Sequence, residues 1–312
     1  MHIFRVFVVV AIVLLIFFSP QIRSIVKGYK ETSIDKATHS QEKVKDFSTN
    51  LEQMKKEKEE EKIDAFIEDS LEAADKIKSK DGKIKILQET LSYYQSKNDH
   101  EKILKYTDDL YNLATDENIY SLQAKSLYYY VFSQMALAQD EQDITGKDYR
   151  VENAKKISLE ALKIMEEKKI KDSNLEGQFY YLLGLTLMES SSSDLFQAEK
   201  MLDVAKERFE KVNDQKGIIQ SIIKLAHIQF LQGEIKKAET ILTPLKENNL
   251  EISEQIQFDY MLSQIEAAKG QINKAISLAE KATEKASTVE KRKINQLLFE
   301  LKKIREMHKE PF

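Results

Sequence analysis

The chain has 312 residues, with 48 Lys or Arg against 52 Asp or Glu, and it contains no cysteine. Charges of both signs are mixed along the chain and leave a formal net charge of −4, which argues against a basic nucleic-acid-binding surface. Only 8 glycines and 3 prolines interrupt a composition rich in helix-forming residues. We therefore predict an all-α protein.

The first distinct segment is the apolar stretch Ile3–Phe18, which is interrupted only by Arg5. A perpendicular membrane-spanning helix needs roughly 20 residues, and this stretch reaches that length if the helix continues to Val26 and its arginines extend toward the interface. No pair of small residues near Pro20 marks a cleavage site. We predict an uncleaved transmembrane signal-anchor over residues 1–26, with an exported protein that has lost a cleaved signal as the alternative.

The side of the membrane on which the rest of the chain lies is less clearly encoded. Lys27, Lys30 and Lys36 follow the apolar stretch, whereas Arg5 alone precedes it. The positive-inside rule then favours a cytoplasmic domain. A short N-terminal tail with one arginine also often stays inside while the chain is exported, so a periplasmic or extracellular domain remains the alternative.

Residues 27–62 are dense in charge and predict a solvated helical spacer that separates the membrane from the following domain. Val44, Phe47, Leu51 and Met54 nevertheless follow a 3-4-3 spacing. This pattern lasts for about one and a half heptads, which is short for a coiled coil. A homodimer through residues 42–62 is therefore an alternative to the simple spacer.

From Ile63 onward the helices are expected to form pairs, because the sequence contains an internal repeat. Gly233 and Gly270 lie 37 residues apart, and so do Ala238 and Ala275. Small residues at such positions allow paired helices to cross with their axes about 8–10 Å apart. Three consecutive units share this pattern: Tyr180, Leu183, Gly184, Ala198, Leu202 and Ala205; Leu225, Ala226, Gly233, Ala238 and Leu242; Leu262, Ser263, Gly270, Ala275 and Ala282.

The pattern resembles the tetratricopeptide repeat (TPR) in a longer-helix, membrane-anchored bacterial form. Two features depart from that family: the chain has no tryptophan, and Pro244 falls earlier than the proline that closes a repeat. The resemblance implies an α-solenoid of about five antiparallel helix pairs, wound as a right-handed superhelix. The repeat domain would cover 63–288, and residues 289–312 would form a capping helix with a polar outer face.

Two earlier pairs carry weaker forms of the pattern. One is expected on either side of a turn at Asn98, after a helix at 63–79. The other would join a helix around 129–136 to a helix around 154–161 through a long loop over 140–149. These units extend the predicted repeat toward the membrane.

Chemistry-bearing motifs are missing from the sequence. Its 5 histidines are scattered, and no phosphate-binding glycine loop, nucleophile elbow or metal-ligand spacing occurs. We predict no catalysis, no cofactor and no metal site.

In the resembling family, the first helices of successive pairs line a concave groove. The inner-face positions that this implies are Tyr181, Leu185, Met188, Gln220, Ile223, His227, Phe230, Tyr260 and Gln264. These side chains are mostly apolar or neutral, and the Lys/Asn pattern by which some family members hold a terminal carboxylate is not matched there. The sequence therefore predicts a protein or peptide partner with an amphipathic or extended segment. The expected function is a non-catalytic, membrane-anchored scaffold or assembly factor, with a peptide-sensing regulator as the alternative.

Overall fold

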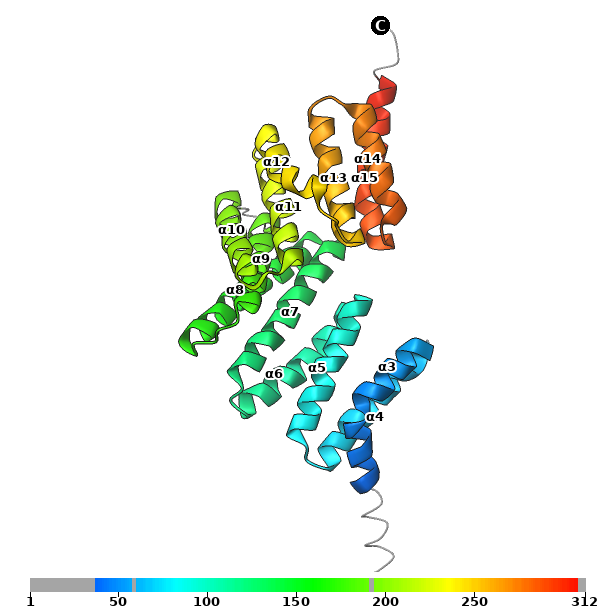
Figure 1. Cartoon of the computed structure of the whole chain (residues 1–312), viewed down its shortest axis with the longest axis vertical. Helices are drawn as coiled ribbons and strands as arrows, with labels where there is room; N and C mark the ends of the chain where they lie inside the picture. The colour runs from blue at the N-terminus through cyan, green and yellow to red at the C-terminus, as the bar shows by residue number, and fades with distance from the viewer. Residues whose placement is uncertain (1–36, 58–59, 191–193, 308–312) are drawn as a thin grey trace, which may run out of the picture. The chain divides into compact units, whose positions relative to one another are not determined.

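The computed structural model describes residues 37–57, 60–190 and 194–307. Within these ranges one helix follows another with no strand between them, which confirms the predicted all-α class (Figure 1). The predicted anchor at 1–26 lies outside the described residues. Among the helices that are described, none combines the length and the apolar character needed to cross a membrane.

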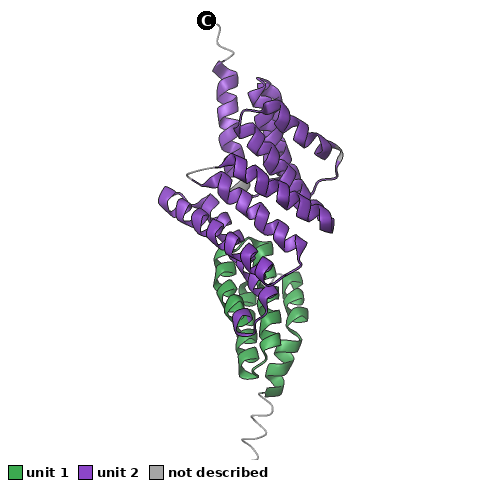
Figure 2. Ribbon diagram, turned by 90° about the vertical axis from the view of Figure 1, so that its left-hand side faces the viewer, with its two compact units in different colours: residues 1–113 green, residues 114–312 purple. Residues whose placement is uncertain are grey.

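The chain divides into two compact units, Met1–Leu113 and Ala114–Phe312 (Figure 2). The first unit holds the helices α3 (Phe47–Glu57), α4 (Glu60–Lys76), α5 (Lys80–Lys97) and most of α6 (His100–Asp116). The turn expected at Asn98 is present, because this residue ends α5 in a left-handed conformation with φ 56°. Asparagine tolerates this conformation better than most residues.

Part of the predicted spacer belongs to the core of the first unit. Phe47 and Leu51 of α3 are 0% and 2% exposed, and the Phe47 ring stacks on Phe66 of α4 at a centroid distance of 5.2 Å. The Ser48 hydroxyl also donates a hydrogen bond to Glu89. The sequence failed to indicate this because two apolar side chains in a charged segment look like a solvated helix unless the surface that they cover is known.

The second unit is built from consecutive helix pairs, in agreement with a repeat of antiparallel hairpins. The first helix of each pair packs on the second, and the first helices of neighbouring pairs also contact one another. The pairs are α7 (Tyr120–Asp140) with α8 (Ile144–Glu167), α9 (Ser173–Glu189) with α10 (Leu195–Val212), α11 (Gln215–Leu231) with α12 (Ile235–Leu242), and α13 (Ile252–Ala268) with α14 (Ile272–Lys285).

Two elements complete the second unit. The short 3-10 helix η1 (Thr243–Glu247) follows α12, because Pro244 cannot donate the backbone hydrogen bond that would continue an α-helix. The last helix, α15 (Thr288–Met307), packs on α14 through the buried residues Ile294, Leu298 and Leu301. It occupies the place of the predicted capping helix.

Helix ends follow local signals in the sequence. Gly233 and Gly270 have φ values of +81° and +79°, and each lies just beyond the end of a first helix, where glycine adopts this conformation without a steric penalty. The long loop expected over 140–149 is wrong. Asp143 accepts a hydrogen bond from the Gly146 N–H and caps α8, so the helix begins at Ile144.

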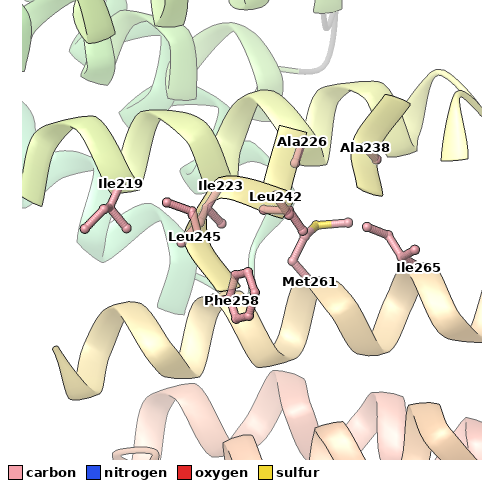
Figure 3. Close-up of a cluster of buried hydrophobic side chains, with 9 residues drawn as sticks. All are labelled: Ile219, Ile223, Ala226, Ala238, Leu242, Leu245, Phe258, Met261 and Ile265. Atoms are coloured by element: carbon pink, nitrogen blue, oxygen red, sulfur yellow. The ribbon is translucent and has the colours of Figure 1, made fainter. Parts of the chain in front are cut away.

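The small residues of the repeat lie at helix crossings. Ala198, Ala226, Ala238 and Ala275 are all 0% exposed. The hydroxyl of Ser263 on α13 donates to the carbonyl oxygen of Ala275 on α14 at 2.7 Å, so the two helix backbones approach closely there. Figure 3 shows the apolar cluster that joins the third and fourth pairs, with side chains from α11 and α13 facing one another.

Candidate functional site

The second unit contains a pocket of about 410 Å³ on the side of its first helices. The helices α7, α9, α11 and α13 each contribute side chains, and α15 adds a fifth wall. The lining consists of Met135, Gln139, Tyr181, Leu185, Met188, Glu189, Ile223, Lys224, His227, Ile256, Gln257, Tyr260, Met261, Gln264, Lys293 and Ile294. Stacking of the hairpins thus brings together residues that lie up to about 160 positions apart in the sequence.

Most of the predicted inner-face residues lie in this one pocket. The lining includes the predicted residues Tyr181, Leu185, Met188, Ile223, His227, Tyr260 and Gln264. Gln220 and Phe230 do not line it. Both are half-buried, and Phe230 packs against the apolar cluster between the third and fourth pairs.

The sequence prediction placed both Ile223 and Phe230 in the groove. Ile223 lines the pocket although it is almost fully buried, whereas Phe230 is half-buried and does not line it. Ile223 is only 4% exposed and belongs to the same apolar cluster as Phe258 and Met261 (Figure 3). Seven residues complete nearly two helical turns, so Ile223 and Phe230 fall on one stripe of α11. That stripe packs into the core, and its residue Ile223 also borders the pocket, while Lys224 and His227, which are three residues apart, share the neighbouring stripe that lines the pocket.

The pocket is not neutral, because three charged residues line it. Glu189 is its one carboxylate among the described residues, and this side chain accepts a hydrogen bond from the Lys147 ammonium at 2.7 Å. Burial opposes ionisation of Glu189, but the bond to Lys147 and the charges of three nearby lysines outweigh it and lower its pKa. Glu189 is therefore an ionised group with a cation already beside it.

Lys224 and Lys293 supply the positive charge. Lys224 is half-buried on α11 and its pKa is lowered, first by burial and second by the like charge of Lys293, while Glu189 acts in the opposite direction. His227 shares this surrounding: burial, followed by the charge of Lys224, lowers its pKa to about 4. The imidazole is therefore neutral near pH 7 and acts as a hydrogen-bonding group.

Amide groups complete the polar part of the lining. Gln257 and Gln264 of α13 each hold a buried side-chain oxygen that has no hydrogen-bond donor among the described residues. The Gln264 side-chain nitrogen contacts the Tyr260 hydroxyl at 3.5 Å. A ligand that donates hydrogen bonds would satisfy acceptors that the protein itself leaves unpaired.

Sequence reasoning missed the charged residues of the site for two different reasons. Lys224 precedes His227 by three residues on α11, so the helical period alone could have placed it on the same face. Lys293 lies on α15, and only the packing of this terminal helix brings it to the pocket. Within the described residues, no group of three or more His, Asp or Glu is arranged to hold a metal ion.

Comparisons with known proteins add little. No protein-family model matches the chain, and no curated protein is similar to it in sequence. Among solved structures, the crystal structure of BtubC (BKLC) from P. vanneervenii is similar over 66% of this chain and 91% of that chain, at 15% identity and a TM-score of 0.40. A likeness this weak decides neither the fold nor the function, so the proposals below depend on the residues of this chain.

Proposed function

We propose that this chain is a membrane-anchored, TPR-like scaffold or assembly factor that binds a segment of another protein in the pocket of its second unit. The observation that carries the proposal is the convergence of side chains from α7, α9, α11, α13 and α15 on one pocket. Nine of its 16 lining residues are apolar or aromatic and seven are polar or charged, so the site can bind a ligand by burial and orient it by hydrogen bonds.

The shape of the site favours a polypeptide ligand. Leu185, Met188 and Tyr260 are half-buried side chains at the pocket, so they offer apolar surface that the fold itself does not fully cover. Methionine and tyrosine adapt to varied apolar partners at modest entropic cost. An extended or amphipathic segment can place alternate side chains on such a surface.

Site-specific photo-crosslinking in intact cells tests this function. A benzophenone amino acid is placed at Tyr260 in the pocket or, as the control, at Phe196, which is 61% exposed on α10 and does not line the pocket. We expect one protein to be captured from Tyr260 and the same adduct to be missing from Phe196. Capture from Phe196 alone would contradict the pocket as the binding surface.

The membrane part of the proposal has its own test. It is based on the apolar stretch Ile3–Phe18, which lies outside the described residues. Fractionation with a carbonate wash, followed by N-terminal sequencing, should find the intact chain in the membrane pellet. A released product that begins near residue 21 would instead indicate a cleaved signal.

A further inference from the structure

The pocket carries more positive than negative charge, because two lysines and one carboxylate line it. Lys224 and Lys293 both line it, and neither lies within ion-pair distance of a carboxylate in the described part of the chain. The one lining carboxylate, Glu189, already pairs with Lys147 at 2.7 Å. Lys224 is half-buried and Lys293 is exposed, so their like charges meet at the mouth of the pocket, where an anion bound between them would remove the repulsion.

The surroundings of these lysines restrict the kind of anion. Leu185, Met188, Ile256, Met261 and Ile294 line the same pocket, so the anion must have apolar groups close to it. A strongly hydrated ion such as free phosphate would lose its hydration against these walls. A carboxylate carried on an apolar body fits both features.

The unpaired glutamine oxygens restrict the ligand further. Gln257 and Gln264 line the pocket, and no donor in the described part of the chain reaches their side-chain oxygens. A ligand carboxylate supplies no such donor. A peptide backbone supplies N–H donors on both sides of an acidic residue, which a simple fatty acid does not. The ligand therefore needs an anion, apolar flanks and backbone donors within one short stretch.

We propose that the pocket binds an acidic side chain of the partner segment, flanked by apolar residues, with Lys224 and Lys293 as its two cationic partners. This inference rests on the proposed function and specifies the chemistry of the partner. The ligand carboxylate would bridge α11 and α15, and it would relieve the repulsion between their lysines. Binding should then also hold the terminal helix more firmly against the pocket.

A peptide selection on the full-length chain in detergent micelles tests the proposal. The probe is a display library of random nine-residue peptides, each flanked by linkers so that no peptide ends in a free carboxyl group. We expect enrichment of sequences with one Asp or Glu between apolar residues. The Lys224→Met/Lys293→Met variant should lose the preference for the acid while still selecting apolar residues, since methionine keeps much of the volume of the lysine stem.

A matched control removes the same charge elsewhere. Lys163 and Lys211 are surface residues of the second unit with side chains 73% and 51% exposed, and neither lines the pocket. The Lys163→Met/Lys211→Met variant should select the same acidic peptides as the natural protein. Circular dichroism verifies folding, and the single variant Lys293→Met, at an exposed position, provides a second test if the double variant does not fold.

Binding of a selected, fluorescently labelled peptide then measures how much its acidic side chain contributes to the affinity. Replacing its Glu by Gln should weaken binding at least about tenfold to the natural protein and change little with the Lys224→Met/Lys293→Met variant. Equal affinity of both peptides for the natural protein would overturn the inference.

The outcomes separate the inference from the proposed function. Enrichment of apolar peptides without an acid would overturn the inference and leave the peptide-binding function standing. No enrichment at all would overturn both. A preference for acidic peptides that persists in the Lys224→Met/Lys293→Met variant would overturn the assignment of the acid to these two lysines. A second library, whose peptides end in a free carboxyl group, tests the other source of a carboxylate, and enrichment in that library alone would overturn an internal acidic side chain as the ligand.

Discussion

Replacing Gly217 by alanine should destabilise the second unit, although alanine is the better helix former. Gly217 lies in the first turn of α11, and its N–H donates to the capping side chain of Asp214. A Cβ at this position would come within 2.4–2.6 Å of three ring carbons of Phe209, which is 3% exposed. The ring has little room to move, because a Cβ at Gly177 on α9 would also lie 2.9 Å from it.

The expected change in the free energy of unfolding is the balance of two opposing effects. Gly→Ala in a helix gains up to about 1 kcal/mol. Overpacking a buried ring costs about 1–3 kcal/mol and should prevail, because a rigid aromatic ring between two helices cannot rotate out of the way. A loss of 1 kcal/mol lowers the melting temperature of a unit of this size by about 2–4 °C.

Gly146 provides a matched control. It occupies the same position in α8, and its N–H donates to the capping side chain of Asp143. The atoms nearest to a Cβ there belong to the Glu141 side chain, at 3.2 Å, and this flexible group can shift. Thermal melts followed by circular dichroism should show a lower melting temperature for Gly217→Ala and an unchanged or higher one for Gly146→Ala.

The double variant Gly217→Ala/Phe209→Leu isolates the proposed cause. The smaller leucine should recover part of the loss, with a coupling energy of about 0.5–3 kcal/mol. If Gly217→Ala is as stable as Gly146→Ala, the close approach of α10 and α11 at Phe209 does not govern stability and this reasoning is refuted.

Three further predictions concern the helix crossings, the core stripe and the buried imidazole. Ala238→Phe and Ala275→Phe should each cost about 1–3 kcal/mol in thermal melts, because both alanines are 0% exposed, whereas the exposed Ala65 should tolerate phenylalanine. Ile223→Ser should cost roughly 2–5 kcal/mol in thermal melts, since this side chain is 4% exposed. His227 should titrate near pH 4 by NMR, well below its value of about 6.5 in an unfolded chain.

The lowered pKa of His227 also makes the stability of the protein depend on pH. The lowered pKa means that the unfolded chain binds a proton on His227 more readily than the folded chain does. The free energy of unfolding is therefore not reduced by His227 above about pH 6.5. As the pH falls toward 4, protonation of His227 in the unfolded chain lowers it by up to about 3 kcal/mol. His227→Gln should reduce this acid sensitivity. Titration of the His227 imidazole near pH 6.5 in the folded protein would contradict its largely buried environment. Melting temperatures that stay unshifted for both Ala238→Phe and Ala275→Phe would contradict the assigned helix crossings.

Local sequence signals predicted much of the second unit. The 37-residue separation of Gly233 and Gly270 gave the hairpin period, and both glycines adopt the positive φ that a helix end requires. Ala198, Ala238 and Ala275 were predicted at crossings and are buried there. Such features can be read from a sequence because helix caps, turns and the 3.6-residue period depend on residues only a few positions apart.

Sequence reasoning was least successful where a residue could face either of two surfaces. Ile223 and His227 were assigned to one groove-lining face of α11, and both line the pocket, yet Ile223 is only 4% exposed and also belongs to the apolar core. When a helix packs between two other helices, its sequence alone does not show which of the two each side chain contacts. Phe47 shows the same limit in the first unit, where a charged segment supplies a fully buried ring.

The helices of the second unit, their pairing and the small residues at which they cross can be read from the chain, because these depend on short-range periodicity and on the bulk of individual side chains. The composition of the pocket, in contrast, depends on how the helices pack. Lys293 lies 69 residues after Lys224, and the two share a site because α15, which packs on α14, also borders the pocket. Contact between such distant residues depends on how whole helices pack, and no local pattern in the chain encodes that arrangement.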